Sequence, residues 1–188
     1  MWNTLVCSAL LATVLLAGCS AGETQKMVSP PAAPEESTAV TAGGDPLVVD
    51  CDAFIDLTDE LPSEYESVLD AVALPTSHSA TRALQASQQA GTQGEAYFAK
   101  TGLLVRPDVA VRIEVVDPSP TGLIGWGSTE FSRSLSISGC SGDKWMAFAG
   151  GFLVPEPQCV KLLVTTQNGR ESVLVGVGAP CQGQEPPP

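Results

Sequence analysis

The chain has few positive charges. Its 188 residues include nine Lys and Arg against 21 Asp and Glu, and the formal net charge is −12. A surface that binds the phosphate backbone needs clustered positive charge, so nucleic acid is not an expected partner. Anionic lipid headgroups also repel an acidic surface, and any attachment to a membrane must therefore come from a covalent lipid.

Histidine and the common catalytic motifs are equally scarce. His78 is the only histidine, which excludes metal sites built from several imidazoles. The sequence has no Cys-x-x-Cys, Gly-x-Ser-x-Gly, His-Glu-x-x-His or Gly-x-x-x-x-Gly-Lys-Ser/Thr motif. We therefore expect no redox-active dithiol, no metal site, no cofactor and no recognisable catalytic residue. His78 lies between two serines, but neighbouring side chains in a loop point in different directions, so a surface histidine is preferred over a catalytic pair.

Two fragments imitate catalytic motifs. Ser141-Gly142-Asp143-Lys144 fits the Ser-x-x-Lys of penicillin-binding enzymes, and Lys100-Thr101-Gly102 fits their Lys-Thr-Gly. In those enzymes the serine motif comes first and opens a helix, whereas here the order is reversed and Ser141 lies in a glycine-flanked turn. Both fragments are interpreted as coincidental.

The sequence begins with a short apolar segment. Residues 5–17 are too few to span a bilayer and are typical of the apolar region of a signal peptide. This segment ends in Leu16-Ala17-Gly18-Cys19, which resembles the lipobox of bacterial lipoproteins: an aliphatic residue, two small residues and a lipid-accepting cysteine. The resemblance implies a diacylglyceryl group on Cys19, removal of residues 1–18, and a location on the extracytoplasmic face of the cell membrane. The alternative is an ordinary secretory signal with a cysteine near its cleavage site.

Composition divides the remaining chain. Residues 1–4 carry no Lys or Arg, unlike the usual basic start of a leader, which suggests that translation begins further upstream. Residues 19–46 are rich in Pro, Gly, Ser and Ala and are predicted to be a disordered tether that carries the lipid. Residues 47–183 are predicted to form one folded domain, and residues 184–188 a disordered tail.

Short strands dominate the predicted domain. Apolar and polar residues alternate most clearly at 109–116 and 131–138, which indicates strands with one buried face. Further strands are predicted within 46–57 and at 83–87, 97–105, 123–126, 145–154, 160–166 and 171–177. Because no crossover helices are visible, these strands predict an all-β, antiparallel β-sandwich that is immunoglobulin-like in style.

One helix is predicted, at residues 63–73. Ser63 and Glu66 have the spacing of a capping box, and apolar residues recur at helical intervals after them. Nine acids and no Lys or Arg lie between Asp45 and Asp70, so a calcium site was considered. An EF-hand loop that starts at Asp50 would place Ile55 where glycine is required, and a solvated acidic face is therefore preferred.

Four cysteines remain for the folded domain, and two disulfides are expected from Cys51, Cys140, Cys159 and Cys181. Asn168-Gly169 predicts a two-residue hairpin in which Val164 faces Val173. In that register Cys159 faces Gly178, so a strand that continued to Cys181 would carry it out of reach. The preferred pairing is Cys140 with Cys159 and Cys51 with Cys181, although a turn at Ala179-Pro180 would allow Cys159 to pair with Cys181.

These observations favour a binding or scaffolding protein over an enzyme. A binding surface could be lined by Trp126, Trp145 and Phe148, but packing in the core is the preferred interpretation of these aromatic residues. The segments at 100–105 and 147–151 resemble those of uncharacterised envelope lipoproteins of high-GC Gram-positive bacteria. This resemblance implies no activity. We expect a membrane-anchored domain that binds an envelope protein or polysaccharide. The alternatives are an envelope hydrolase with a site assembled from distant residues, and an extracytoplasmic ligand or cation sensor.

Overall fold

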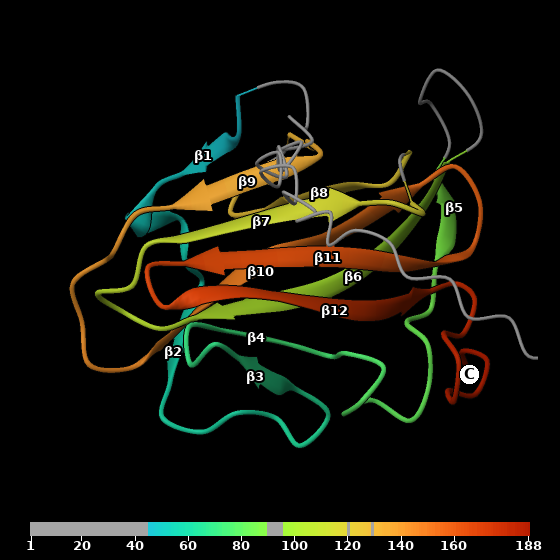
Figure 1. Cartoon of the computed structure of the whole chain (residues 1–188), viewed down its shortest axis with the longest axis horizontal. Helices are drawn as coiled ribbons and strands as arrows, with labels where there is room; N and C mark the ends of the chain where they lie inside the picture. The colour runs from blue at the N-terminus through green and yellow to red at the C-terminus, as the bar shows by residue number, and fades with distance from the viewer. Residues whose placement is uncertain (1–44, 90–95, 120, 129) are drawn as a thin grey trace, which may run out of the picture. The chain divides into compact units, whose positions relative to one another are not determined.

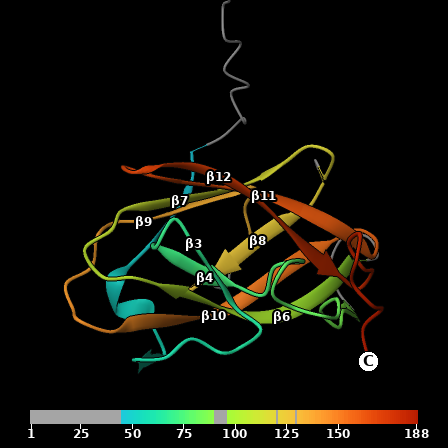
Figure 2. The ribbon, with the colours of Figure 1, turned by 60° about the horizontal axis from the view of Figure 1, so that its bottom comes forward.

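A computed structural model describes residues 45–89, 96–119, 121–128 and 130–188, and these residues form two β-sheets (Figure 1). The five-stranded sheet has the order β1 (Leu47–Val49), β9 (Ser134–Ile137), β7 (Val111–Val116), β11 (Gln158–Thr166) and β12 (Gly169–Val177). The seven-stranded sheet has the order β2 (Asp56–Thr58), β10 (Trp145–Val154), β6 (Ala96–Val105), β4 (Val72–Leu74) and β3 (Glu66–Val68), with β5 (Ser87–Gln89) paired to β6 and β8 (Leu123–Trp126) paired to β10. Figure 2 shows the two sheets as separate layers, which confirms the predicted β-sandwich.

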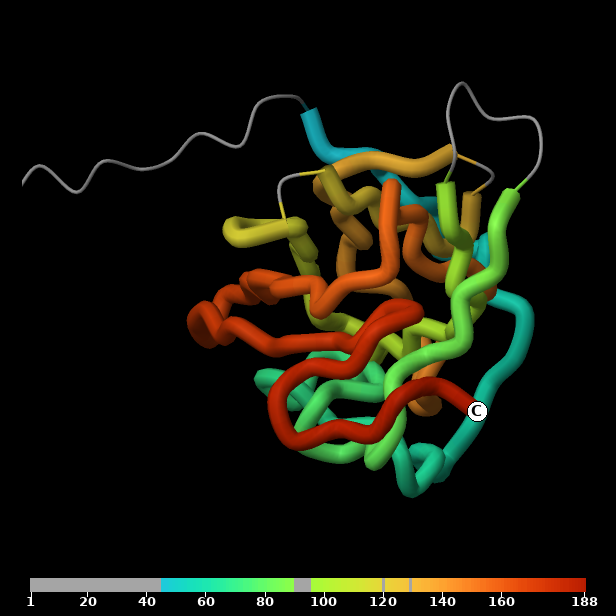
Figure 3. Tube along the Cα trace, turned by 90° about the vertical axis from the view of Figure 1, so that its right-hand side faces the viewer, coloured from blue at the N-terminus to red at the C-terminus, as the bar shows by residue number. Residues whose placement is uncertain are grey.

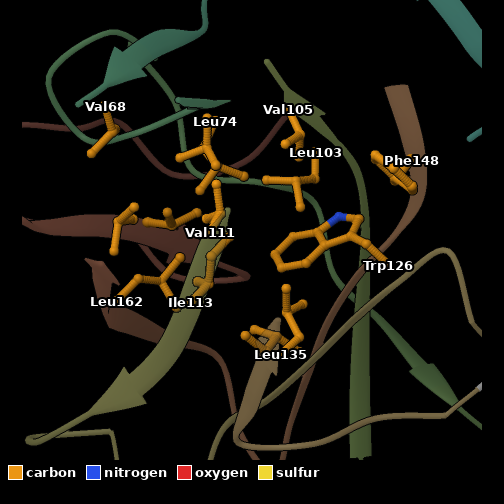
Figure 4. Close-up of a cluster of buried hydrophobic side chains, with 14 of the residues drawn as sticks. Val68, Leu74, Leu103, Val105, Val111, Ile113, Trp126, Leu135, Phe148 and Leu162 are labelled. Carbon is orange, nitrogen blue, oxygen red and sulfur yellow. The ribbon is translucent and has the colours of Figure 1, made fainter. Parts of the chain in front are cut away.

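The core fills the space between the two sheets. In β7 the side chains of Val111, Ile113 and Val115 are buried, while the residues between them are partly exposed, as the alternating sequence predicts. Trp126 of β8 is fully buried among core side chains that include Leu103 and Leu135 (Figure 4). Its indole Nε1 donates a hydrogen bond to the Thr101 carbonyl at 3.0 Å. The one polar atom of the buried Trp126 side chain therefore has a hydrogen-bond partner.

Strand β10 is the central strand of the larger sheet. It pairs with β6 along one edge, and on its other edge its first residues pair with β2 and its last with β8. At Gly150 the neighbouring strand approaches so closely that a Cβ atom would lie 1.9 Å from the Gly125 carbonyl oxygen. The glycine in this apolar strand is therefore required by the close contact between two backbones.

The predicted helix at residues 63–73 is wrong. These residues include β3, a tight turn and the start of β4, and in the turn Leu69 and Asp70 have positive φ angles of 53° and 51°. Val72, Ala73 and Leu74 are all fully buried, because β4 lies between β3 and β6 and has both faces covered. Within the described residues the one helical element is the short 3-10 turn Cys51–Ala53. Of the apolar residues with helical spacing, Val68 lies in β3, Leu69 in the turn and Val72 in β4, so the spacing belongs to a tight hairpin.

The β11–β12 hairpin forms in a register two residues away from the predicted one. Thr166 pairs with Gly169, so the turn residues are Gln167 and Asn168, and Val164 faces Glu171. A shift of two residues preserves the face of every side chain. The predicted apolar face is accordingly buried as expected, with Val160, Leu162, Val164, Val173, Val175 and Val177.

Both disulfides differ from the preferred pairing: the bonds are Cys51–Cys140 and Cys159–Cys181. Strands β1 and β9 are parallel, with Val49 opposite Ile137, so Cys51 and Cys140 leave the same end of the pair and their Cα atoms are 5.5 Å apart. A parallel pair was not foreseen among predicted antiparallel strands.

The other disulfide depends on a turn after β12. The chain turns at Gly178, which has a φ of 69°, and does not continue as a strand. Figure 3 shows this C-terminal segment curving back beside the chain that precedes β5. The turn brings Cys181 to a Cα separation of 4.9 Å from Cys159.

The predicted start of the disordered tail, at residue 184, is too early in the chain. The Gln184 side chain donates a hydrogen bond to the Ala80 carbonyl at 3.0 Å, and the Glu185 amide donates one to the Thr81 carbonyl at 2.9 Å. Arg82 and Glu185 form an ion pair at 2.9 Å. Residues 184 and 185 therefore belong to the folded domain.

The predicted signal peptide and most of the predicted tether, Cys19 included, lie outside the described residues. Within the part of the chain that the structure describes, no helix is long and apolar enough to cross a membrane.

Candidate functional site

A small hollow lies where three parts of the larger sheet meet. Strand β2 ends there, β10 begins there, and β6 continues into the loop that leads to β7. The hollow has a volume of about 140 Å³ and is lined by Thr58, Asp59, Arg106, Pro107, Asp143, Lys144 and Trp145. Four of these seven residues carry a charge, which makes the hollow a candidate binding site for a polar ligand.

Backbone contacts and a disulfide fix the loops around the hollow. The Arg106 amide donates a hydrogen bond to the Ala71 carbonyl at 2.8 Å, and the Asp108 amide donates one to the Cys140 carbonyl at 2.7 Å. Cys140 is in turn bonded to Cys51. The loop that carries Arg106 and the loop that carries Asp143 are thereby tied to each other and to the start of the domain.

Arg106 lies against an aromatic ring. Its guanidinium carbon is 5.2 Å from the centroid of the Trp145 ring, a cation–π distance. Trp145 is only 8% exposed, because it packs with Ala73 and Leu104 on the outer face of the larger sheet. Among the described residues no carboxylate lies within ion-pair distance of Arg106. Its guanidinium is therefore held in place by stacking, with its hydrogen-bond donors available.

Lys144 and Asp59 form an ion pair at the hollow. The Lys144 Nζ donates a hydrogen bond to the Asp59 carboxylate at 2.7 Å. This hydrogen bond and the charge of Asp59 raise the pKa of Lys144 above its ordinary value, and the nearby Asp143 adds to the same effect. Both side chains are substantially exposed, so the ion pair fixes the positions of the two groups and adds little to the free energy of unfolding.

We expect Asp59→Asn to lower the pKa of Lys144. A raised folded-state pKa means that the Lys144–Asp59 attraction stabilises the fold fully below the pKa of unfolded lysine, and that this contribution is lost as the pH rises through the folded-state pKa. The substitution should therefore weaken stability slightly at neutral pH and very little at strongly alkaline pH. NMR titration of the Lys144 side chain measures the shift. Asp117→Asn, at the far end of β7, is the control and should leave that titration unchanged.

His78 is on the surface, as predicted. Its side chain is 77% exposed, and its Nδ1 lies 3.6 Å from the Glu66 carboxylate. The same carboxylate accepts a hydrogen bond from the buried Thr76 hydroxyl. The Ser79 hydroxyl donates to the Glu64 carbonyl at 2.7 Å, which commits it to the backbone. These contacts fix the turn at 76–79 and do not align a serine with the imidazole.

The acidic segment between Asp45 and Asp70 does not converge on a point. Within the described ranges, no group of three or more His, Cys, Asp or Glu residues could hold a metal ion. Asp56 accepts a hydrogen bond from the Leu57 amide at 2.8 Å, and Asp59 is paired with Lys144. The described carboxylates of this segment therefore form no shared binding site.

The three aromatic residues considered in the sequence are all buried. Trp126 and Phe148 are fully buried in the core between the sheets, as preferred. Trp145 packs in the separate outer cluster and also lines the hollow.

The charged residues of the hollow were not found from the sequence. Arg106 lies in no motif, and Lys144 lies in a fragment that only imitates one. They meet only because β10 pairs with both β2 and β6. No protein-family model, no curated protein and no solved structure matches this chain. The chemistry of the hollow therefore has to be inferred from its own residues.

Proposed function

We propose that this protein is a bacterial lipoprotein whose β-sandwich domain is displayed on the extracytoplasmic face of the cell membrane and binds a ligand there without catalysis. The observation that carries the proposal is Leu16-Ala17-Gly18-Cys19 at the end of a short apolar segment. Two acyl chains on Cys19 would hold the protein firmly, because each buried methylene contributes about 0.8 kcal/mol.

The disulfides support both the compartment and the choice of cysteine. Disulfides persist in oxidising environments and are rare in the cytoplasm. The bonds Cys51–Cys140 and Cys159–Cys181 use all four cysteines of the domain. Once a leader of residues 1–18 is removed, Cys19 is the one cysteine left with a thiol that can accept a lipid.

The chemistry of the hollow favours binding. Thr58 is the one hydroxyl among its seven lining residues, and this hydroxyl donates to the Glu60 carbonyl at 2.8 Å. None of the seven is a histidine or a cysteine. A serine or cysteine nucleophile next to a histidine base is not assembled among these seven residues. Fixed positive and negative groups are instead suited to recognising a ligand, whether free or part of an envelope protein or polysaccharide.

Cys19→Ala should abolish lipidation. In a bacterial host that is fed an alkyne fatty acid, the wild-type chain should become labelled and should fractionate with membranes. Cys7→Ala is the matched control, because Cys7 belongs to the expected leader and its loss should leave the label intact. Labelling of the Cys19→Ala variant at the wild-type level would show that the assignment is wrong.

A further inference from the structure

The turn that joins β11 to β12 presents an asparagine followed by a glycine (Figure 1). Asn168 is the second turn residue and is exposed, and Gly169 is the first residue of β12. Asparagine is a chemically labile residue, and Asn168 is the single asparagine of residues 4–188. A following glycine makes an asparagine most reactive, because it has no side chain to obstruct attack by its own backbone nitrogen.

The tip of this hairpin leaves the reacting groups accessible. A Cβ atom placed on Gly169 would meet no other atom within 4 Å, so the space beside this residue is open. The Asn168 backbone N–H donates to the Thr166 hydroxyl at 3.1 Å, and among the described residues its side-chain amide has no hydrogen-bond partner. Thr166 and Gly169 form the last pair of the β11–β12 ladder. Such a terminal pair opens without unfolding the rest of the sheet.

We propose that Asn168 is a site of spontaneous deamidation in the folded protein. The Gly169 nitrogen loses its proton to solvent and attacks the Asn168 Cγ atom, which forms a nitrogen–carbon bond and closes a five-membered succinimide. The bond from Cγ to the side-chain nitrogen breaks, and ammonia leaves. Water then adds to either carbonyl carbon of the ring, and the ring opens to aspartate or to isoaspartate. Water is the one co-reactant.

Both products change the tip of the hairpin. Each replaces a neutral amide with a carboxylate. In isoaspartate the main chain also runs through the former side chain, which lengthens the backbone between residues 168 and 169 by a carbon atom. The register of a hairpin is fixed by the length of its turn, so this product should not re-form the Thr166–Gly169 pair.

A second pair in the same chain is a matched control. Gln182 and Gly183 are both exposed, and a Cβ atom on Gly183 would also meet nothing within 4 Å. Glutamine has an additional methylene group, so the corresponding attack closes a six-membered ring, which is reached less readily from an exposed side chain. The two pairs share exposure and open space and differ in the length of the reacting side chain.

Mass spectrometry of the full chain tests the proposal. The folded protein is incubated at mildly alkaline pH, then reduced and digested with trypsin at mildly acidic pH, and cleavage after Lys161 and Arg170 places the two pairs in adjacent peptides. The peptide 162–170 should convert with time into two acidic products, aspartate and isoaspartate, which chromatography separates. The peptide 171–188 should convert at least about tenfold more slowly.

A variant and a free peptide complete the test. Asn168→Gln should slow the conversion of peptide 162–170 at least about tenfold, and glutamine is tolerated there because Asn168 does not have a positive φ angle. Since only a terminal pair has to open, the folded chain should convert within about a hundredfold of the rate of a synthetic 162–170 peptide. An intact Asn168 in the folded chain after the free peptide has converted completely would overturn the proposal. Equal conversion of peptides 162–170 and 171–188 would also contradict it.

Discussion

Trp126→Ala should destabilise the domain by about 4 kcal/mol, because removing a buried large aromatic residue leaves a cavity that the surrounding core fills only in part. Trp126 is fully buried, packs edge-on against Phe152 at a centroid distance of 5.3 Å and donates a hydrogen bond to the Thr101 carbonyl. The substitution therefore removes apolar contacts and also leaves a carbonyl of β6 without its donor. Urea unfolding of the full chain, followed by circular dichroism, measures the change in the free energy of unfolding.

Two controls separate the contributions to that loss. Trp126→Phe keeps most of the apolar volume and removes the indole N–H, so it should destabilise the domain less than Trp126→Ala. Leu174→Ala removes an apolar side chain that is 37% exposed and should change the free energy of unfolding by less than about 1.5 kcal/mol. If Trp126→Ala lowered the free energy of unfolding by no more than Leu174→Ala does, the indole would not occupy the core.

Alternation along single strands predicted most of the fold. Apolar and polar residues alternate along β7 with a period of two. That period alone predicts a strand with one buried face. Spacing alone failed at residues 63–73, because the apolar residues with helical intervals are divided between β3, the turn after it and β4. A tight hairpin of two three-residue strands can place apolar residues at the same intervals as a helix turn. Only the pairing of β4 with β3 and with β6 distinguishes the two.

Pairing between distant segments could not be predicted in the same way. The parallel β1–β9 pair determines which cysteines meet, and nothing in the three residues of β1 specifies a parallel partner. The hollow has the same origin. Asp59, Arg106 and Lys144 come from three separate parts of the chain, and each has an ordinary sequence context.

The acidic start of the domain also has a structural explanation. Strand β2 is the edge strand of the larger sheet next to β10, and Leu57 in it is 45% exposed. The Leu57 amide bonds to the Asp56 carboxylate at 2.8 Å. Charged residues on a short edge strand discourage another chain from extending the sheet. The solvated acidic face predicted from the sequence is thus, at β2, a protected sheet edge.

Removing the Cys51–Cys140 disulfide should be the more damaging of the two disulfide deletions. The cysteines are 89 residues apart, and a loop of that length constrains the unfolded chain by roughly 4.5 kcal/mol at 25 °C. Cys159 and Cys181 are 22 residues apart, which corresponds to roughly 3.5 kcal/mol. Chemical unfolding of the variants Cys51→Ala/Cys140→Ala and Cys159→Ala/Cys181→Ala, each compared with the wild-type chain, measures both losses.

The two variants should also differ in a property that loop length does not determine. Cys140 fixes the loop that carries Asp143, and its carbonyl accepts the Asp108 amide beside Arg106 and Pro107. Loss of the Cys51–Cys140 bond should therefore speed amide hydrogen exchange in the loop around Asp143, whereas loss of the Cys159–Cys181 bond, which anchors the C-terminal turn, should not. Peptide mapping without reduction must first recover the Cys51 and Cys140 peptides together. Equal hydrogen exchange of that loop in the two folded variants would show that the hollow keeps its shape without the disulfide, and that backbone hydrogen bonds alone hold Arg106 and Asp143.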